Sequence, residues 1–388
     1  MSAAGAVRDR LRDQPLPGEA EATARSWAVV EAALAERAPT AATRSPRRTA
    51  LRLAFVAALL AAGLAVALSP AGAAVGDWIG DRFTVHDARS APAFAALPKG
   101  GSVIAVSRSG TYAVRPDGST RHLGAFSDVG WSPHGLHVVG TEGRRVAAVD
   151  PAAGTVKWML TSRGRVSHPA WSTADGFAVA YLEGRALKVV AGNGDPTTNR
   201  MLRRDAAPVT PAWRPHSDRI LTYATGGGML VTLDVTTGRV LARSPGAGTA
   251  EPPRSIAWAP GGRRLVALGS QSVSVLDRAL HVRRTIPLPA AARDLALHPS
   301  GKRAAVVVRR AVLDVPLAGA AGPERLFQGN VDGIAWSQDG RRLLLGWRGA
   351  DQWLLLGPGG RIRALHGVSR ELGAAGDFPR VAGWCCAG

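Results

Sequence analysis

From about residue 100 onward, the chain alternates short apolar runs with turn residues. Apolar runs such as FAVAYL, RLVALG, RAAVVV and RLLLGW each follow a turn rich in Gly, Asp or Pro. Runs this short, bounded by turn residues, are typical of strands rather than helices. The pattern therefore predicts an all-β region built from many short strands.

One position, which we call the anchor, marks each repeat of this pattern. A Trp or Leu follows a Gly or Ala at intervals of 39 to 48 residues, and a turn comes after most of these positions. A period in this range predicts a β-propeller, in which a large side chain fills the gap between neighbouring sheets. The predicted anchors are Trp131, Trp171, Trp213, Trp258, Leu297, Trp336 and Trp384.

The number of blades follows from how the two ends of the repeat region fit together. Strands are predicted at 102–107, 111–115 and 120–123, and this group lacks a first strand of its own. A strand around 381–384 would supply it, which closes the ring and removes an open sheet edge. We therefore predict a seven-bladed β-propeller over residues 101–388. Six blades are the alternative, if the first hairpins pack outside the ring.

The residues around the anchors resemble the repeats of known propellers. The phrases at 129–133 and 334–337 resemble the anchor phrase of TolB-like and WD-repeat propellers, and the resemblance covers about residues 100–388. The phrase Asp-x-x-x-Gly-x-Val-x-Trp at 150–158 also resembles quinone-type propeller repeats. It occurs in full only once, so no quinone cofactor is predicted.

An uncharged run precedes the repeats. Residues 53–76 carry no charged side chain, several Arg residues come before them, and Asp77 and Asp81 follow. About 20 apolar residues span a bilayer as a helix, and positive charge on one flank favours a cytoplasmic location for that flank. We predict a single transmembrane helix at 51–76, a cytoplasmic helical arm at 1–50, a linker at 77–100 and an extracytoplasmic propeller. Secretion after cleavage near Ala73 is the alternative.

The predicted arm carries a candidate docking helix. Residues 19–37 are rich in Ala and place apolar residues at helical spacing. The order of arm, membrane span and outer domain resembles that of single-pass anti-sigma factors of bacteria, although the zinc-binding His and Cys residues of that family are absent. This resemblance implies a cytoplasmic partner for residues 1–50.

The formal net charge of +19 comes almost entirely from Arg. A bias towards Arg, Ala and Gly is typical of a GC-rich genome, and no basic cluster interleaved with aromatic residues marks a nucleic-acid groove. We interpret the charge as the composition of a solvated surface and expect no nucleic-acid partner. Cys385 and Cys386 are adjacent, and adjacent Cα atoms lie closer than in most disulfides. We interpret them as buried or free thiols.

The sequence predicts no catalytic, cofactor-binding or metal-binding residues, and no ligand-binding residue is assigned. It contains no nucleophile elbow, P-loop, HExxH motif or EF-hand loop. Three His residues fall in turns after anchors, where hydrogen bonding within the turn is the expected role: His134, His216 and His298.

Two functions are consistent with this organisation. The first is a membrane-anchored, extracytoplasmic binding or scaffold module for a protein, peptide or glycan, without enzymatic activity. The alternative is a transmembrane signalling protein, in which the propeller senses and the N-terminal arm regulates a cytoplasmic partner. Fold alone does not decide between them.

Overall fold

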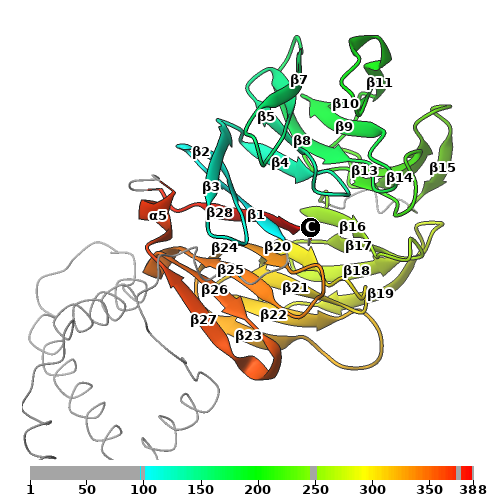
Figure 1. Ribbon diagram of the computed structural model, residues 1–388. Helices are drawn as coiled ribbons and strands as arrows, with labels where there is room; N and C mark the ends of the chain where they lie inside the picture. Colours follow the sequence, from blue (N-terminus) through cyan, green and yellow to red (C-terminus); the bar gives the residue numbers. More distant parts are fainter. Residues whose placement is uncertain (1–96, 98–100, 245–250, 373–376, 387–388) are drawn as a thin grey trace, which may run out of the picture. The chain divides into compact units, whose positions relative to one another are not determined.

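The computed structural model describes residues 97, 101–244, 251–372 and 377–386. The strands in these ranges form seven antiparallel sheets of four strands each, arranged as a ring (Figure 1). The prediction of a seven-bladed propeller is confirmed, and the six-bladed alternative is wrong.

Six of the sheets are each built from one continuous stretch of chain. Their first strands are β4 (Asp128–Trp131), β8 (Val166–Trp171), β12 (Ala212–Trp213), β16 (Ser255–Trp258), β20 (Ala292–Leu297) and β24 (Val331–Trp336). Their second strands are β5 (Val138–Glu142), β9 (Ala178–Glu183), β13 (Ile220–Ala224), β17 (Leu265–Leu268), β21 (Arg303–Val308) and β25 (Leu343–Trp347).

The remaining strands of these sheets follow in chain order. The third strands are β6 (Arg145–Val149), β10 (Ala186–Ala191), β14 (Leu230–Asp234), β18 (Ser272–Leu276), β22 (Ala311–Pro316) and β26 (Gln352–Leu356). The outer strands are β7 (Val156–Thr161), β11 (Arg200–Arg203), β15 (Val240–Arg243), β19 (Val282–Pro287), β23 (Glu324–Gln328) and β27 (Ile362–His366).

The seventh sheet, which we call the closing sheet, joins the two ends of the described chain. β28 (Arg380–Cys385) pairs with β1 (Ser102–Ser107), and β2 (Gly110–Val114) and β3 (Thr120–Gly124) complete the order β28-β1-β2-β3. Val103 lies opposite Trp384 in the antiparallel register. The predicted closure of the ring by a C-terminal strand is confirmed.

The core lies between neighbouring sheets. One cluster combines Val139 and Val146 of one sheet with Val179 and Tyr181 of the next. The second and third strands are covered on both faces, so they read as continuous apolar runs rather than alternating ones. All four residues of β17 are buried, for example. This packing of sheet on sheet explains why the apolar runs repeat with the blade.

The predicted fold is corrected in its N-terminal part. In the described ranges no helix is long and apolar enough to cross a membrane. The longest helix there is α5 (Val368–Glu371), whose four residues fall far short of the roughly 20 that a span requires. The short turns η1 (Pro196–Thr198), η2 (Arg348–Ala350) and η3 (Pro358–Gly360) are 3-10 helices. The predicted arm at 1–50 and helix at 51–76 fall outside the described residues.

Candidate functional site

The first strands of the seven sheets surround the axis of the ring and form a central channel. Each contacts the first strands of its two neighbours, in the order β28, β4, β8, β12, β16, β20, β24 and back to β28. Because every sheet repeats the same strand order, the last residues of these strands gather at one end of the channel. We call this the anchor end, and the opposite end the polar end.

The predicted anchors lie at the anchor end. Six of them are the last residue of a first strand, and the seventh is the fifth residue of β28. Four of the side chains are buried, with exposed fractions of 4% to 9%. In chain order the anchors are Trp131, Trp171, Trp213, Trp258, Leu297, Trp336 and Trp384.

Some anchor indoles link one sheet to the sheet before it. Nε1 of Trp213 donates to the carbonyl oxygen of Ala170 at 3.0 Å, and Nε1 of Trp336 donates to that of Ala296 at 3.2 Å. Each acceptor is the small residue that precedes the neighbouring anchor. Ala or Gly at that position brings the carbonyl within reach of the indole.

Three consecutive sheets around the ring closure lack this link. The indole N–H groups of Trp384, Trp131 and Trp171 are buried and have no hydrogen-bond partner among the described residues. A buried donor without a partner costs about 1–3 kcal/mol. The anchor end is therefore less well satisfied on the side of the closing sheet.

A Ser after the anchor closes the turn in three of the continuous sheets. The hydroxyl oxygen of Ser132 accepts the N–H of His137 at 2.9 Å, and that of Ser337 accepts the N–H of Arg342 at 2.9 Å. Ser172 accepts the N–H of the first residue of β9 in the same way. β28 pairs instead with β1, which comes much earlier in the chain, and Cys385 stands where the Ser would be.

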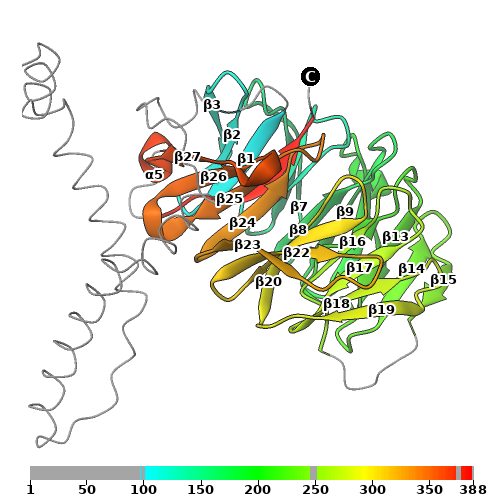
Figure 2. The same cartoon turned by 90° about the horizontal axis from the view of Figure 1, so that it is seen from below.

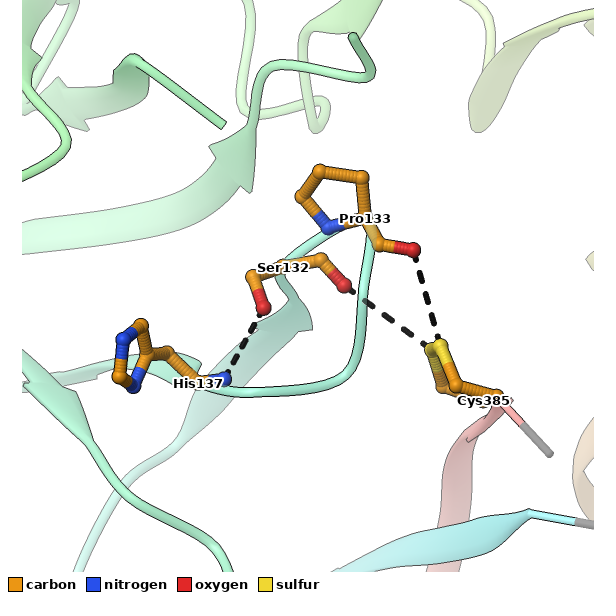
Figure 3. Close-up of a disulfide and its surroundings, with 5 residues drawn as sticks. Ser132, Pro133, His137 and Cys385 are labelled. Atoms are coloured by element: carbon orange, nitrogen blue, oxygen red, sulfur yellow. Dashed lines mark hydrogen bonds between the residues drawn. A yellow bond between two sulfur atoms is a disulfide. The ribbon is translucent and has the colours of Figure 1, made fainter. Parts of the chain in front are cut away.

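Cys385 and Cys386 form a disulfide. Their interpretation as buried or free thiols is therefore wrong. The sulfur of Cys385 lies 3.9 Å from the carbonyl oxygen of Ser132, and that of Cys386 lies 3.6 Å from the carbonyl oxygen of Pro133 (Figure 3). These are packing contacts, because disulfide sulfurs carry no proton. The disulfide thus rests against the first turn of the next sheet.

The turn leaves room for the disulfide because of a glycine. Gly135 has φ +68°, and a Cβ at this position would lie 2.9 Å from Sγ of Cys386. Glycine adopts this backbone conformation without steric cost. Any other side chain would push the disulfide away from the turn.

The disulfide forms part of the wall of a cavity of about 430 Å³ at the anchor end, which we call the disulfide pocket. Most of the other lining side chains are apolar and come from β20, β24 and β28, and Gln338 is the main polar side chain. The pocket is open to solvent, and polar and apolar atoms share its surface about equally. Ligand sites are typically mostly apolar cavities of about 300–1,000 Å³ with few polar groups. The lining includes Pro133, Leu295, Leu297, Trp336, Trp384, Cys385 and Cys386.

The polar end of the channel is shaped by bulges in the first strands. The register shifts in β8 between Ser167 and Ala170, in β20 between Ala292 and Asp294, and in β24 between Val331 and Ile334. Bulges bend a strand and redirect side chains. Here the bulged segments carry polar residues, including a His and two Asp: His168, Asp294 and Asp332.

Two of these residues titrate away from their ordinary range. Burial raises the pKa of Asp294, although the Leu295 N–H that its carboxylate accepts and the charge of Arg380 both oppose this. Burial lowers the pKa of His168, and the nearby carboxylate of Asp128 opposes that shift. Groups with shifted pKa values gather at functional sites, but they also occur in structural networks.

The His residues in the turns after the anchors take part in local turn structure. His298 accepts the N–H of Ser300 at Nδ1, at 3.0 Å, and its Nε2 lies 3.0 Å from the carbonyl oxygen of Gly340. His216 has φ +60°, as turn residues often do. In the described part of the chain, no group of three or more His, Cys, Asp or Glu is placed to hold a metal ion.

No protein-family model and no curated protein matches the chain. Solved structures do match. The β-propeller domain of Cps50 (Swd1) from Myceliophteria thermophila superposes with a TM-score of 0.53 at 17% identity, covering 62% of this chain and 86% of that one. A chain of the Mitotic Checkpoint Complex gives 0.50 at 18% identity, covering 62% and 78%. The fold is a seven-bladed β-propeller with WD-repeat-like structural neighbours. At this identity the likeness shows the fold alone.

The anchor positions could be read from the sequence, whereas the disulfide pocket and Asp294 could not. The signal for the pocket is the replacement of Trp-Ser-Pro at 131–133 by Trp-Cys-Cys at 384–386. Seen as a departure from the repeat, it marks the anchor end of the closing sheet. For Asp294 the sequence offers no signal, because the bulge that adjoins this half-buried residue in β20 has no marker in the local sequence.

Proposed function

We propose that this chain is a binding module that recognises a protein or peptide partner at the anchor end of its channel, with a glycan as a further candidate. The observation that supports this is the disulfide pocket, an open pocket of about 430 Å³ lined by β20, β24, β28 and the turn at Pro133. Its lining side chains are mostly apolar, and an open pocket of this size can accept a side chain of a partner.

The test fills the pocket without disturbing the ring. Leu297 is the one anchor that is not Trp, and it lines the pocket. Leu297→Trp restores the residue used at the six other anchors, so the fold should tolerate it while the cavity shrinks. Leu297→Met keeps the volume and serves as the matched control.

Crosslinking and pull-down from intact cells with the full chain provide the measurement. A partner captured by the wild type and by Leu297→Met, but lost with Leu297→Trp, is the expected result. Equal capture of that partner by a folded Leu297→Trp variant would contradict binding through the pocket.

We also propose that the chain is not an enzyme. The disulfide pocket presents apolar side chains and sulfurs without protons, which suit binding better than proton transfer or nucleophilic attack. A screen of the purified full chain against ester, peptide and glycoside substrates tests this. Turnover that is lost with Leu297→Trp and kept with Leu297→Met would contradict the proposal.

We propose further that the propeller works outside the cytoplasm. The Cys385–Cys386 disulfide supports this, because disulfides persist in oxidising compartments and are rare in reducing ones. Cell fractionation combined with a thiol-reactive mass tag tests the location. The tag should react with the two cysteines only after reduction, in a non-cytoplasmic fraction. Recovery of the protein in the cytoplasmic fraction with two thiols that react without reduction would contradict the proposed location.

A further inference from the structure

The outer strands of the seven sheets carry basic residues almost without acidic ones. Each has at least one exposed Arg or Lys, and together they contain nine basic residues against the single acidic residue Glu324. These strands lie at the periphery of the ring (Figures 1 and 2). We call one exposed residue from each strand, taken together, the basic rim: Arg121, Lys157, Arg200, Arg243, Arg283, Arg325 and Arg363.

The overall composition of the chain does not account for the rim. Basic and acidic residues stand at 48 to 29 over the whole sequence, but at nine to one on the outer strands. Many acidic residues instead occupy turns, where their carboxylates accept backbone N–H groups. Asp150, for example, accepts the N–H groups of Ala152 and Ala153. The two signs of charge are therefore separated by position in the blade.

Most of the rim charge is not neutralised within the protein. Lys157 lies 3.3 Å from a carboxylate oxygen of Asp150, and Arg283 lies 2.5 Å from one of Asp277. The other five rim residues form no ion pair with any described residue. Arg200, for instance, donates to the carbonyl oxygen of Thr236 at 2.9 Å, which leaves its charge in place.

Protection of the sheet edges explains part of the positive charge at these positions but not the near-absence of acidic residues. Charged side chains on edge strands, Lys above all, discourage pairing with other chains. A single sign at every blade edge adds repulsion between neighbouring residues, which mixed charges would avoid. The bias is therefore the feature that calls for a ligand.

We propose that the basic rim binds a flexible linear polyanion whose charges are phosphate groups. Six of the seven rim residues are Arg, and the guanidinium group binds phosphate oxygens in pairs. The blade edges point away from the axis in all directions, so a flat surface can touch only neighbouring edges. A flexible polymer can follow the edges around the ring. This surface is separate from the disulfide pocket.

Long-chain inorganic polyphosphate is the probe, titrated into the full chain over a series of salt concentrations. The test variant carries Arg121→Gln, Arg243→Gln and Arg363→Gln, three rim residues without an ion pair. The matched control carries Arg263→Gln, Arg264→Gln and Arg341→Gln, which removes the same charge from exposed turns after Trp258 and Trp336. Both variants change exposed side chains, and thermal unfolding verifies that both are folded.

The wild type should bind polyphosphate, and the logarithm of its binding constant should fall linearly with the logarithm of the salt concentration. Loss of three phosphate contacts, at about 0.7 each, should reduce the slope by about 2 in the rim variant. Its affinity should fall at least about tenfold near 0.15 M salt, whereas the turn variant should stay within about threefold of the wild type.

Three outcomes would overturn the proposal. They are absence of polyphosphate binding by the wild type, equal losses in the two variants, and rim-dependent binding of anionic lipid vesicles without binding of polyphosphate. The Leu297→Trp variant should keep full polyphosphate binding. The proposal for the disulfide pocket and the proposal for the rim can therefore fail independently.

Discussion

The closing sheet and the six continuous sheets have the same four-stranded form but are held together differently. In a continuous sheet, every strand is joined to the next by a short turn. In the closing sheet, β28 meets β1 from the far end of the described chain. Its Cys385 also contacts Ser132 of the next sheet, across 253 residues of sequence. Closure thus depends on contacts that form only when the ring is nearly complete.

This difference concentrates the weaknesses of the ring in one place. The unpaired indole N–H groups of Trp384, Trp131 and Trp171 belong to the closing sheet and the two sheets that follow it. The indoles of Trp213 and Trp336, in two of the other sheets, are paired. Long-range pairing costs loop entropy that local turns avoid, so the closing sheet should form late and open first.

Removal of the closing strand should have the largest effect. A chain that ends at Pro379 lacks β28, which leaves the edge of β1 unpaired and removes Val381 and Trp384 from the core. Loss of these two side chains alone costs about 5 kcal/mol or more, comparable to the whole stability of many domains. Far-ultraviolet circular dichroism with urea unfolding should show loss of the cooperative transition.

A chain that ends at Cys386 is the control for this truncation and should unfold like the full chain. An unchanged urea midpoint for the chain ending at Pro379 would mean that the other six sheets hold the ring without closure. The closing sheet would then contribute no more to the stability of the ring than the other sheets do.

Substitutions at two anchors should measure what a single indole hydrogen bond contributes to stability. Trp171 and Trp213 are similarly buried, at 6% and 4% exposed, but only Trp213 donates to a carbonyl oxygen. Trp213→Phe removes that bond. Trp171→Phe removes a donor that had no partner. Trp213→Phe should therefore destabilise more, by about 1–2 kcal/mol in urea unfolding. Equal losses would show that both indoles contribute through packing alone.

Two carboxyl groups should respond to pH with opposite signs. The pKa of Asp294 is raised by burial, with Arg380 of the closing strand opposing. The native state therefore binds more protons than the unfolded state above the ordinary Asp pKa of about 3.9, and stability falls as pH rises through the raised value. The pKa of Asp150 is lowered, chiefly by the N–H of Ala153. Its contribution is present above about pH 4 and is lost as pH falls through the lowered value.

Asp294→Asn and Asp150→Asn form the matched pair for this prediction, measured by urea unfolding between pH 3 and 7. As pH rises, the free energy of unfolding of Asp294→Asn should increase relative to that of the wild type. The free energy of unfolding of Asp150→Asn should decrease relative to that of the wild type. Parallel stability curves for the two variants would contradict a pKa of Asp294 raised by its surroundings.

The repeat made most of the ring predictable from sequence. The spacing of the anchors, the missing first strand before β1 and the apolar segment at 381–384 all follow from residue order and the need to cover sheet faces. The pocket wall depends instead on side chains from β20, β24 and β28, which converge only after the ring has closed. Asp294 likewise lies half-buried beside a bulge in β20 that no local signal marks. The basic rim could not be predicted from the net charge, because it depends on which Arg and Lys residues lie on the outer strands.

The disulfide itself should have the smallest effect on stability. A disulfide between adjacent residues closes a loop of minimal length. Because the entropy that a disulfide removes from the unfolded state grows with the length of this loop, the stabilisation should be small. The double variant Cys385→Ser, Cys386→Ser should therefore shift the free energy of unfolding by less than about 1 kcal/mol, far below the loss of β28. Capture of the pocket's partner should still fall, because hydroxyl groups replace the apolar disulfide in the wall. A large loss of stability would mean that the bridge, rather than the β28–β1 ladder, holds the ring closed.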